Sequence, residues 1–356
     1  FPGGVLAGRL EGEIRVLVVA GRLSFDSAAQ PVQPSTVYDL ASLTKPLATV
    51  TSVLLLVQAG KLKLDVAVGD VLVELKHAPI GVASVRDLLS HRSGLPGWRP
   101  LYERLDAEGC AWGRAEAGVV RQTVLRLIRE ESLVSQIGEQ SLYSDLGFIL
   151  LGCAVERASG LSLDEYFCEA VTQPLGVNAL FFNRTGAATS QSRLSRSDVM
   201  IAPTEWDDWR QRMLKGEVHD ENAAAMGGVA GHAGLFGTAE SVLAVSGAWL
   251  AGYHGDRSIL DRQLVQEFTT KQSHPRQSSW ALGWDTPTTP SSSGTHFSPE
   301  AFGHLGFTGT SLWIDPRRKL EVVLLTNRVH PSRSNDSIRG FRPLIHDLTY
   351  GLLTRA

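Results

Sequence analysis

Hydrophobic residues near both ends of the chain follow the pattern of β-strands. Residues 5–10 and 14–20 are rich in aliphatic and β-branched side chains, and Glu11-Gly12 between them predicts a hairpin turn. Segments of the same character return late in the chain, with a turn at residues 316–318. The predicted strands comprise residues 5–10, 14–20, 280–284, 311–315 and 320–326.

The middle of the chain has helical periodicity instead. The clearest case is residues 42–59, where five apolar residues recur at alternating spacings of four and three, as one face of a helix requires. Gly60 ends this segment. Further helices are predicted over residues 85–89, 115–131, 146–158, 163–171, 240–250 and 341–353. Polar, turn-rich segments predict loops at residues 184–197, 273–279 and 287–298.

This order of elements, with strands at both ends and helices between them, predicts an α/β (α+β) fold. Since connected strands tend to share one sheet, we expect a central antiparallel sheet built from both chain ends and flanked by helices. A mostly helical domain would be inserted into it. The sheet domain would comprise residues 1–60 and 236–356, and the helical domain residues 61–235. Chemistry is expected at their junction, where clefts often lie.

Composition excludes several classes of function. The 356 residues carry a net charge of −3 and no basic stripe, so a nucleic-acid partner is not expected. The longest apolar run, residues 50–57, is too short to span a membrane. Cys110, Cys153 and Cys168 lack C-x-x-C spacing, so we expect neither disulfides nor a structural zinc site.

No metal or other cofactor is expected from the remaining polar residues. His219, Asp220 and Glu221 are potential ligands, but three consecutive residues do not easily converge on one ion, and no second cluster has ligand spacing. A structural or cleft-lining role is the favoured interpretation of this triplet. His232 lies among glycines and is expected to line the cleft.

Lysine is scarce, and one lysine follows a serine at a chemically useful distance. Only seven of the 34 basic residues are lysines. In Ser42-Leu43-Thr44-Lys45 the hydroxyl and the ammonium are three residues apart, on one helix face. At the helix N-terminus, Ser42 would lie near free N–H groups that favour negative charge. If Lys45 is buried, its pKa should fall toward neutrality, so that it accepts the Ser42 proton. The tetrad alone leaves a helix cap followed by a solvated lysine equally open.

Two further segments favour catalysis. Tyr143-Ser144-Asp145 opens a predicted helix, and a tyrosine beside a lysine has a lowered pKa and can act as a general base. Residues 303–310 are glycine-rich and precede a strand, so a backbone N–H there can pair with that of Ser42 as an oxyanion hole. Taken singly, Asp145 would be a helix cap, and residues 303–310 would be a bulged strand.

Together these segments resemble the serine β-lactamase and penicillin-binding-protein superfamily. Within it they are most similar to the class C-like serine hydrolase branch, which includes family VIII carboxylesterases and D-aminopeptidases. The resemblance covers nearly the whole chain. It rests on residues 38–46 (YDLASLTKP), 88–96 (LLSHRSGLP), 143–145 (YSD), 304–306 (HLG), 218–222 (VHDEN) and 231–236 (GHAGLF), which occur in the family's order.

The resemblance implies the β-lactamase/transpeptidase-like fold and a set of residue roles. Ser42 would be the acylated nucleophile, Lys45 its activating partner and Tyr143 the general base. The backbone N–H groups of Ser42 and Phe307 would form the oxyanion hole. The residues expected to bind substrate are Asp145, His304, Gly306 and His232.

Two departures from the family pattern affect the expected activity. The third motif is His304-Leu305-Gly306 where lactamases carry Lys-Thr-Gly, so a permanent cation and a hydroxyl for a substrate carboxylate are both missing. Asp145 replaces the usual asparagine, and its carboxylate would raise the pKa of Lys45 and favour Tyr143 as the base. Ester or amide hydrolysis is therefore favoured over β-lactam hydrolysis.

We expect a serine hydrolase that forms an acyl-enzyme on ester or amide bonds, as a carboxylesterase or a cell-wall-peptide amidase or peptidase. Its β-lactamase activity would be weak or absent. Two alternatives stay open: a non-catalytic penicillin- or peptidoglycan-binding module, and an acyltransferase.

The expected partner is a small ester or amide, or a peptidoglycan-derived peptide, and the oligomeric state is open. The resemblance favours a periplasmic or exported location. The chain starts at Phe1, almost directly before a strand and without room for the helix that normally precedes it in this family. We therefore expect that an N-terminal segment has been removed.

Overall fold

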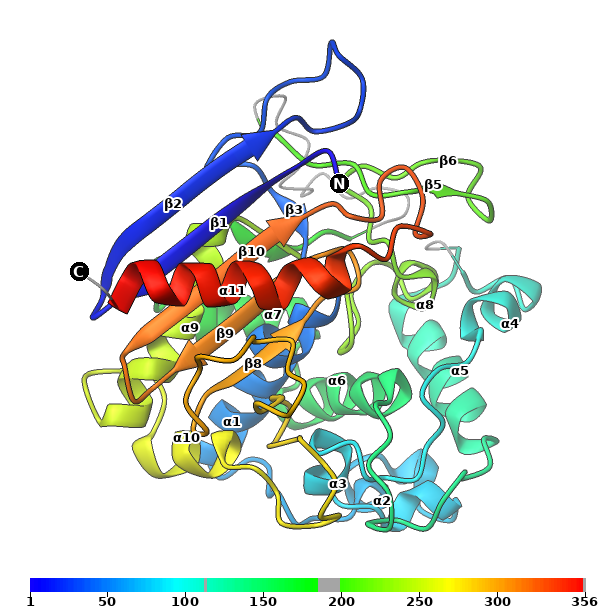
Figure 1. Cartoon of the computed structure of the whole chain (residues 1–356). Coiled ribbons are helices and arrows are strands. Elements are labelled where there is room, and N and C mark those ends of the chain that lie inside the picture. Colours follow the sequence, from blue (N-terminus) through cyan, green and yellow to red (C-terminus); the bar gives the residue numbers. More distant parts are fainter. Residues whose placement is uncertain (112–113, 185–198, 355–356) are drawn as a thin grey trace.

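The computed structural model describes residues 1–111, 114–184 and 199–354. Its largest sheet is antiparallel and five-stranded, in the order β2-β1-β10-β9-β8 (Figure 1). The pairing of β1 with β10 places Val5 opposite Leu325, so both ends of the chain build the sheet. The strands are β1 (Gly3–Leu10), β2 (Glu13–Gly21), β8 (Phe302–Leu305), β9 (Ser311–Asp315) and β10 (Leu320–Thr326). The predicted fold class is confirmed.

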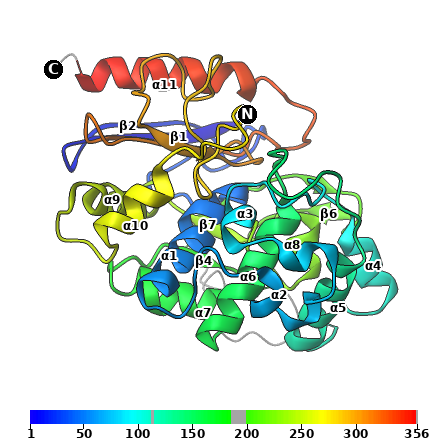
Figure 2. The ribbon, with the colours of Figure 1, turned by 90° about the horizontal axis from the view of Figure 1, so that it is seen from below.

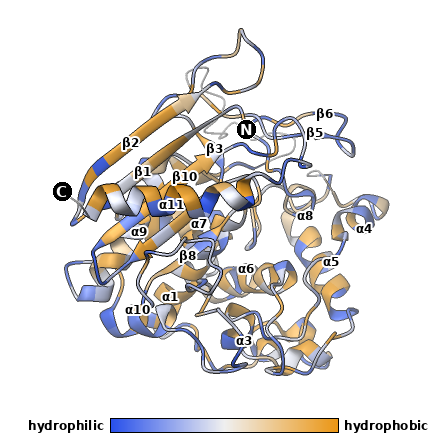
Figure 3. Cartoon of the chain, viewed as in Figure 1, coloured by the Kyte–Doolittle hydropathy of each residue, from blue (hydrophilic) through white to orange (hydrophobic). Residues whose placement is uncertain are grey.

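Helices cover both faces of this sheet (Figure 2). The C-terminal helix α11 (Ile338–Thr354) lies on one face, and the other helices lie on the opposite face. Alternate residues of β1 point to opposite faces of the sheet: Leu6 packs on the α11 side, whereas Val5 and Ala7 pack in the main core on the other side. This follows from the period of two in a strand. Figure 3 shows apolar residues on the strands and on the helices beneath them.

The helices beneath the sheet include the longer segments that the sequence predicts, except residues 341–353, which form α11 on the other face. The central one, α6 (Asp145–Ser159), has a continuous run of ten buried residues, as expected of a helix that is apolar on all sides. Helices α2, α4, α8 and α10 were not predicted, because segments this short show little periodicity. The helices are α1 (Thr51–Gln58), α2 (Val68–Val71), α3 (Val85–Leu89), α4 (Leu101–Ala107), α5 (Ala117–Arg129), α6, α7 (Leu163–Phe167), α8 (Glu221–Ala225), α9 (Ala239–His254) and α10 (Arg262–Thr269). The domain boundaries stay a prediction.

The helix predicted over residues 42–59 is present, but it is not a single α-helix. It begins as a 3-10 turn at Ala41–Leu43, continues as a π-helix at Lys45–Val50 and then becomes α1. Pro46 has no N–H to close an α-helical bond at this turn, and π-turns are frequent at functional sites. The stretch Ala41–Gln58 is long and apolar enough to cross a membrane, but 78% of it is buried inside the protein, as in a core helix.

The strand predicted at residues 280–284 is wrong. These residues form a tight turn, in which the N–H of Ala281 donates to the Trp284 carbonyl at 2.8 Å and Gly283 adopts a φ of 81°. A Cβ at Gly283 would lie 2.2 Å from Val50, so both its backbone and its surroundings require glycine. The turn brings Trp280 into contact with the candidate site.

A smaller sheet, in the order β3-β7-β4, joins distant parts of the chain. It pairs Asp39, just before Ser42, with Phe236, just after the glycine-rich segment that contains His232. Its strands and those of a separate ribbon are β3 (Tyr38–Asp39), β4 (Leu180–Phe182), β7 (Leu235–Gly237), β5 (Trp206–Asp207) and β6 (Arg212–Met213). Of the loop predicted at 184–197, residues 185–197 lie outside the described residues.

Candidate active site

The turn that carries Ser42 is fixed by hydrogen bonds from three sides. Asp39 accepts from the N–H of Ala41 at 2.9 Å, and the hydroxyls of Thr308 and Thr310 donate to the carbonyls just before the turn at 2.7 and 3.0 Å. Ala41 has a φ of 47°, a left-handed conformation that is costly for a residue with a side chain. The surrounding bonds therefore hold a strained backbone immediately before Ser42.

Lys45 is fully buried and points at Ser42. Its Nζ lies 3.1 Å from Ser42 Oγ, 3.0 Å from the carbonyl oxygen of His232 and 2.7 Å from Asp145 Oδ1. Burial lowers the pKa of Lys45, but the charge and hydrogen bonds of Asp145 and Tyr143 raise it, and the net pKa lies above its ordinary value. The expected fall toward neutrality is therefore wrong, and the expected effect of Asp145 on Lys45 is confirmed.

Tyr143 completes this group. Its ring centroid lies 4.9 Å from Lys45 Nζ, and the interactions of its hydroxyl with Lys45 and Ser42 act to lower its pKa. The pKa of Tyr143 is raised, because burial raises it by more than Lys45 lowers it. The expectation that Lys45 lowers the pKa of Tyr143 is correct, but the expectation that the net pKa of Tyr143 is lowered is wrong. At neutral pH the group therefore consists of an ammonium, a phenol and a hydroxyl.

An aromatic enclosure surrounds the Tyr143 ring. The ring centroids of His91, Trp280 and His304 lie 4.6, 5.5 and 6.0 Å from it. His91 also fixes the loop that carries Tyr143, because its Nδ1 accepts from the N–H of Ser144 at 3.0 Å. Burial, together with the Lys45 charge, holds the pKa of His91 well below its ordinary value, so this acceptor stays neutral. Sequence reasoning missed Trp280, since it placed this residue on a strand.

The third motif lies at the end of β8, next to the nucleophile turn. Burial and the Lys45 charge lower the pKa of His304 to about 3, so the ring is uncharged at neutral pH. A Cβ on Gly306 would lie 2.5 Å from the Leu40 carbonyl, which makes glycine necessary for this close approach. Within the described residues, no hydrogen bond engages the backbone N–H of Ser42 or of Phe307. The oxyanion-hole role that the resemblance implies for these two groups stays a prediction.

The arginines around Phe307 are held by other protein groups. Arg328 stacks at 4.4 Å on the Phe307 ring, which is 48% exposed, and donates to the Phe307 carbonyl at 2.8 Å. Arg342 donates to the Gly306 carbonyl at 2.6 Å. Arg333 pairs with two carboxylates, those of Glu205 and Glu221, both at 2.7 Å. Each guanidinium near the third motif, among the residues described, therefore already has partners.

The segment of residues 218–222 lies beside these groups. The ring of His219 is bonded to Glu205 at 2.7 Å, and the backbone N–H of His219 donates to Asp39 at 2.6 Å. Asp220 is bonded to the ring of His232 at 2.7 Å. In the parts of the chain that are described, no three metal-binding side chains gather around one point. The substrate-binding role expected of His232 stays a prediction, but its ring is 1% exposed and is held by a carboxylate.

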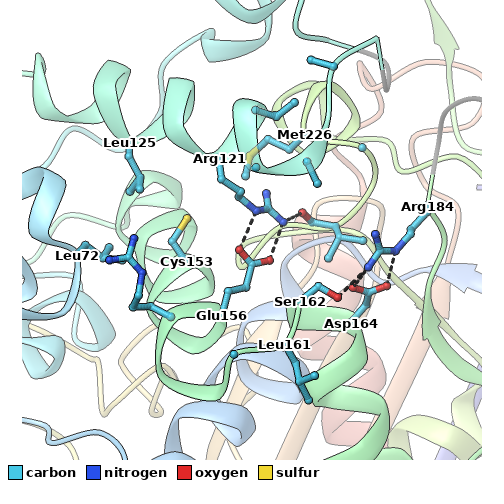
Figure 4. A pocket seen from close by; sticks show the side chains of 18 residues that line it. Leu72, Arg121, Leu125, Cys153, Glu156, Leu161, Ser162, Asp164, Arg184 and Met226 are labelled. Atoms are coloured by element: carbon cyan, nitrogen blue, oxygen red, sulfur yellow. Dashed lines mark hydrogen bonds and ion pairs between the residues drawn. The ribbon is translucent and has the colours of Figure 1, made fainter.

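A separate pocket of about 560 Å³ lies between α5 and α6 (Figure 4). Its polar residues are paired: Arg121 with Glu156 at 2.9 Å, and Arg184 with Asp164 at 2.7 Å. Burial raises the pKa of the Cys153 thiol in its wall to about 12, so this cysteine is not a nucleophile at neutral pH. The residues lining this pocket include none of the predicted catalytic residues.

Comparisons with known proteins identify the family. The family model described as Beta-lactamase matches residues 1–345. A protein of Escherichia coli (strain K12), named as a candidate D-alanyl-D-alanine carboxypeptidase, is 33% identical over 322 residues, which cover 85% of this chain and 71% of that protein.

Solved structures show the same fold. EstCE1, described as a hydrolase with promiscuous acyltransferase activity, aligns with a TM-score of 0.75 and 22% identity, covering 98% of this chain and 94% of its own. The octameric penicillin-binding protein homologue from Pyrococcus abyssi aligns with a TM-score of 0.70 and 23% identity, covering 97% and 73%. Fold, family match and relatives together indicate an enzyme of the serine hydrolase type. The chain belongs to the β-lactamase family.

Proposed function

We propose that this protein hydrolyses esters or amides through an acyl-enzyme on Ser42, and that its preferred substrates carry no carboxylate next to the bond that is cleaved. The observation that carries the proposal is the position of one buried lysine beside both partners: Lys45 Nζ lies 3.1 Å from Ser42 Oγ and 4.9 Å from the centroid of the Tyr143 ring. A nucleophile and its base within hydrogen-bond reach are the mark of covalent catalysis. This favours an enzyme over a non-catalytic binding module.

Acylation begins when the Lys45–Tyr143 pair loses one proton. Ser42 Oγ then attacks the substrate carbonyl, while its proton passes to Tyr143 and is shared with Lys45. The oxyanion that forms accepts hydrogen bonds from the N–H groups of Ser42 and Phe307. As the C–O or C–N bond breaks, the pair returns the proton to the leaving group, and the acyl group stays on Ser42.

Deacylation repeats these steps with water as the nucleophile. Water attacks the acyl carbonyl and gives its proton to the Tyr143–Lys45 pair, which then protonates Ser42 Oγ as the acyl bond breaks. An acyltransferase would use an alcohol or amine acceptor in place of this water. The two reactions share every step on the protein, so the ratio of hydrolysis to transfer in the presence of an added alcohol distinguishes them.

Replacing Asp145 with asparagine is expected to move the rising limb of the pH profile to lower pH. The carboxylate raises the pKa of both Lys45 and Tyr143, and the active form is the one in which this pair has lost a proton. Without the negative charge the proton leaves more easily. The measurement is kcat/KM for an aryl ester against pH, which reports groups of the free enzyme. A limb that stays in place or moves to higher pH contradicts this account.

The preference for uncharged substrates follows from the third motif. His304 is neutral because its pKa is about 3, Leu305 has no hydroxyl, and Arg328, Arg333 and Arg342 are already bonded to protein groups. A substrate carboxylate placed there would lose its hydration without gaining a cation. This favours a carboxylesterase over a peptidase that recognises a free C-terminus, although relatives carry a carboxypeptidase name.

A substrate panel tests this preference. With p-nitrophenyl butyrate, a cephalosporin and a peptide ending in D-alanyl-D-alanine, we expect the ester to be preferred in kcat/KM by about 100-fold or more. The double variant His304→Lys/Leu305→Thr, which restores the cation and the hydroxyl, should raise cephalosporin turnover relative to ester turnover. Faster hydrolysis of the carboxylated peptide than of the ester by the parent enzyme would overturn the proposed substrate class.

A further inference from the structure

Residues 227–234 form a loop that contacts the buried lysine, and we call it the lysine loop. It reaches Lys45 through one atom, the carbonyl oxygen of His232, 3.0 Å from Nζ. Two other carbonyls of the loop are held from outside: Thr49 Oγ1 donates to Gly231 at 2.7 Å, and Arg121 donates to Val229 at 2.8 Å. Figure 4 shows Arg121 pointing toward its partner Glu156 on α6.

Close packing against α6 leaves the lysine loop no room to shift toward that helix. A Cβ on Gly231 would lie 2.0 Å from the Phe148 carbonyl, and a Cβ on Gly152 would lie 2.9 Å from the Gly231 nitrogen. The backbone just before His232 is therefore fixed by these contacts. The direction of the His232 carbonyl then depends on what holds the His232 side chain.

The His232 ring is held by Asp220. The ring is 1% exposed, and its Nε2 lies 2.7 Å from Asp220 Oδ1. Asp220 is itself fixed, because it caps α8 and accepts from the N–H of Ala223 at 2.7 Å. Among the described residues, Nδ1 of His232 has no hydrogen-bond partner, so Asp220 is what orients the ring. A carboxylate behind a histidine fixes ring orientation in the same way at many active sites.

We propose that Asp220 and His232 are positioning residues for Lys45. The carboxylate fixes the ring, the ring fixes the adjoining carbonyl, and the carbonyl holds the ammonium against Ser42 and Tyr143. Neither side chain needs to touch the substrate. The inference rests on the proposed function, because it assigns the pair to a lysine that activates Ser42.

Asp220 also acts on Lys45 through its charge. Burial raises the pKa of Asp220, but the interaction with His232, the hydrogen bond from Ala223 and, as a smaller contribution, the charge of Lys45 lower it, and the net pKa lies below its ordinary value. The attraction between Asp220 and Lys45 is mutual, so the carboxylate also favours the charged form of the lysine. Of the surrounding groups, His91 and His304 have lowered pKa values and stay neutral. The titratable groups that face the Lys45–Tyr143 pair are His91 after α3, Asp145 on α6, Asp220 before α8, His232 in the lysine loop and His304 on β8. Asp145 and Asp220 are the carboxylates among them.

Three variants separate positioning from plain structural support. Asp220→Asn keeps a good helix cap and an acceptor for the His232 ring but removes the charge, so the rising limb of kcat/KM for p-nitrophenyl butyrate should move to lower pH. His232→Ala removes the ring and should lower the plateau by about 10- to 100-fold, as a misplaced catalytic group does. His232→Gln places an amide N–H near the position of Nε2 and should recover most of that loss.

Glu221→Gln is the matched control. This residue is next to Asp220 on the same helix turn, but its carboxylate pairs with Arg333, so the limb and the plateau should match the parent. Labelling of Ser42 by a p-nitrophenyl phosphonate, followed by intact mass, is measured in parallel, and thermal unfolding checks that each variant is folded.

The outcomes distinguish the two proposals. If the parent is never labelled on Ser42, the proposed function fails, and the inference fails with it. If the parent is labelled but Asp220→Asn and His232→Ala keep its limb and plateau, the inference is overturned and the proposed function stands. If His232→Ala does not fold, the test rests on the other two variants: the rising limb of the kcat/KM profile of Asp220→Asn and the plateau of His232→Gln. A rising limb of Asp220→Asn at the same pH as that of the parent overturns the proposal.

Discussion

Replacing Ser42 with alanine is expected to lower kcat for an aryl ester by roughly 10⁴- to 10⁶-fold, the size of loss seen when a serine nucleophile is removed. The reason is chemical: Lys45 Nζ lies 3.1 Å from Ser42 Oγ, and the Tyr143 hydroxyl also interacts with this serine. Without the Ser42 hydroxyl, the two residues have no nucleophile to activate. Intact mass spectrometry should show acyl and phosphonyl adducts on the parent and none on the variant. Residual turnover would come from substrate binding and the oxyanion hole alone.

Ser52→Ala provides the matched control for this experiment. Ser52 is also buried, lies on α1 in the same helical stretch, and has no side-chain hydrogen-bond partner among the described residues. Its replacement removes a hydroxyl of the same kind without touching the site, so activity and adduct formation should equal those of the parent. Equal activity in the parent and in Ser42→Ala would remove the basis of the acyl-enzyme mechanism.

Replacing Tyr143 with phenylalanine is expected to lower kcat/KM by about 10²- to 10⁴-fold, the usual contribution of a general base. The change removes one oxygen and keeps the ring, so the stacking on His91 and Trp280 is retained. The loss should therefore fall on the rate of acylation and not on folding. Stopped-flow measurement of p-nitrophenol release separates acylation from deacylation, and both steps should slow.

Tyr102→Phe is the control for the second experiment. The Tyr102 hydroxyl is bonded to Glu103 at 3.1 Å, and its ring packs on Trp209, away from Lys45. Parent-like rates are expected for this variant. If Tyr143→Phe also keeps parent-like rates, the base is Lys45 alone, and the role of the tyrosine is limited to enclosing it.

The fold could be predicted from the sequence because each strand and each long helix has a hydrophobic pattern that repeats over neighbouring positions. Residues 5–10, 14–20, 311–315 and 320–326 alternate or run apolar over several positions, and in the structure they pair in one antiparallel sheet. The helix at residues 146–158 has enough turns for its burial pattern to be recognised. Residues 280–284 were assigned wrongly, since the left-handed φ of Gly283 and its contact with Val50 depend on a neighbour more than 200 residues away in the chain.

In the candidate site, too, one part follows from local spacing in the chain and another depends on the folded structure. Ser42 and Lys45 are three residues apart, so one helical turn brings them together, and this part of the geometry is determined by spacing. The protonation of Lys45 is not local: burial lowers its pKa while Asp145 and Tyr143 raise it. Only the folded structure decides which effect is larger, because desolvation and charge attraction depend on distances that the chain order does not set.

The sequence by itself determined the strands of the main sheet at both chain ends with the longer helices between them, the spacing of Ser42 and Lys45, and the missing cation at His304. The tertiary structure alone decided what surrounds them. His232 contacts Lys45 from 187 positions away, Asp220 holds its ring through a helix cap, and Trp280 closes the enclosure of Tyr143 from a turn. Spacing within a turn fixes local neighbours, whereas contacts between distant segments exist only after the sheet and the helices have packed together.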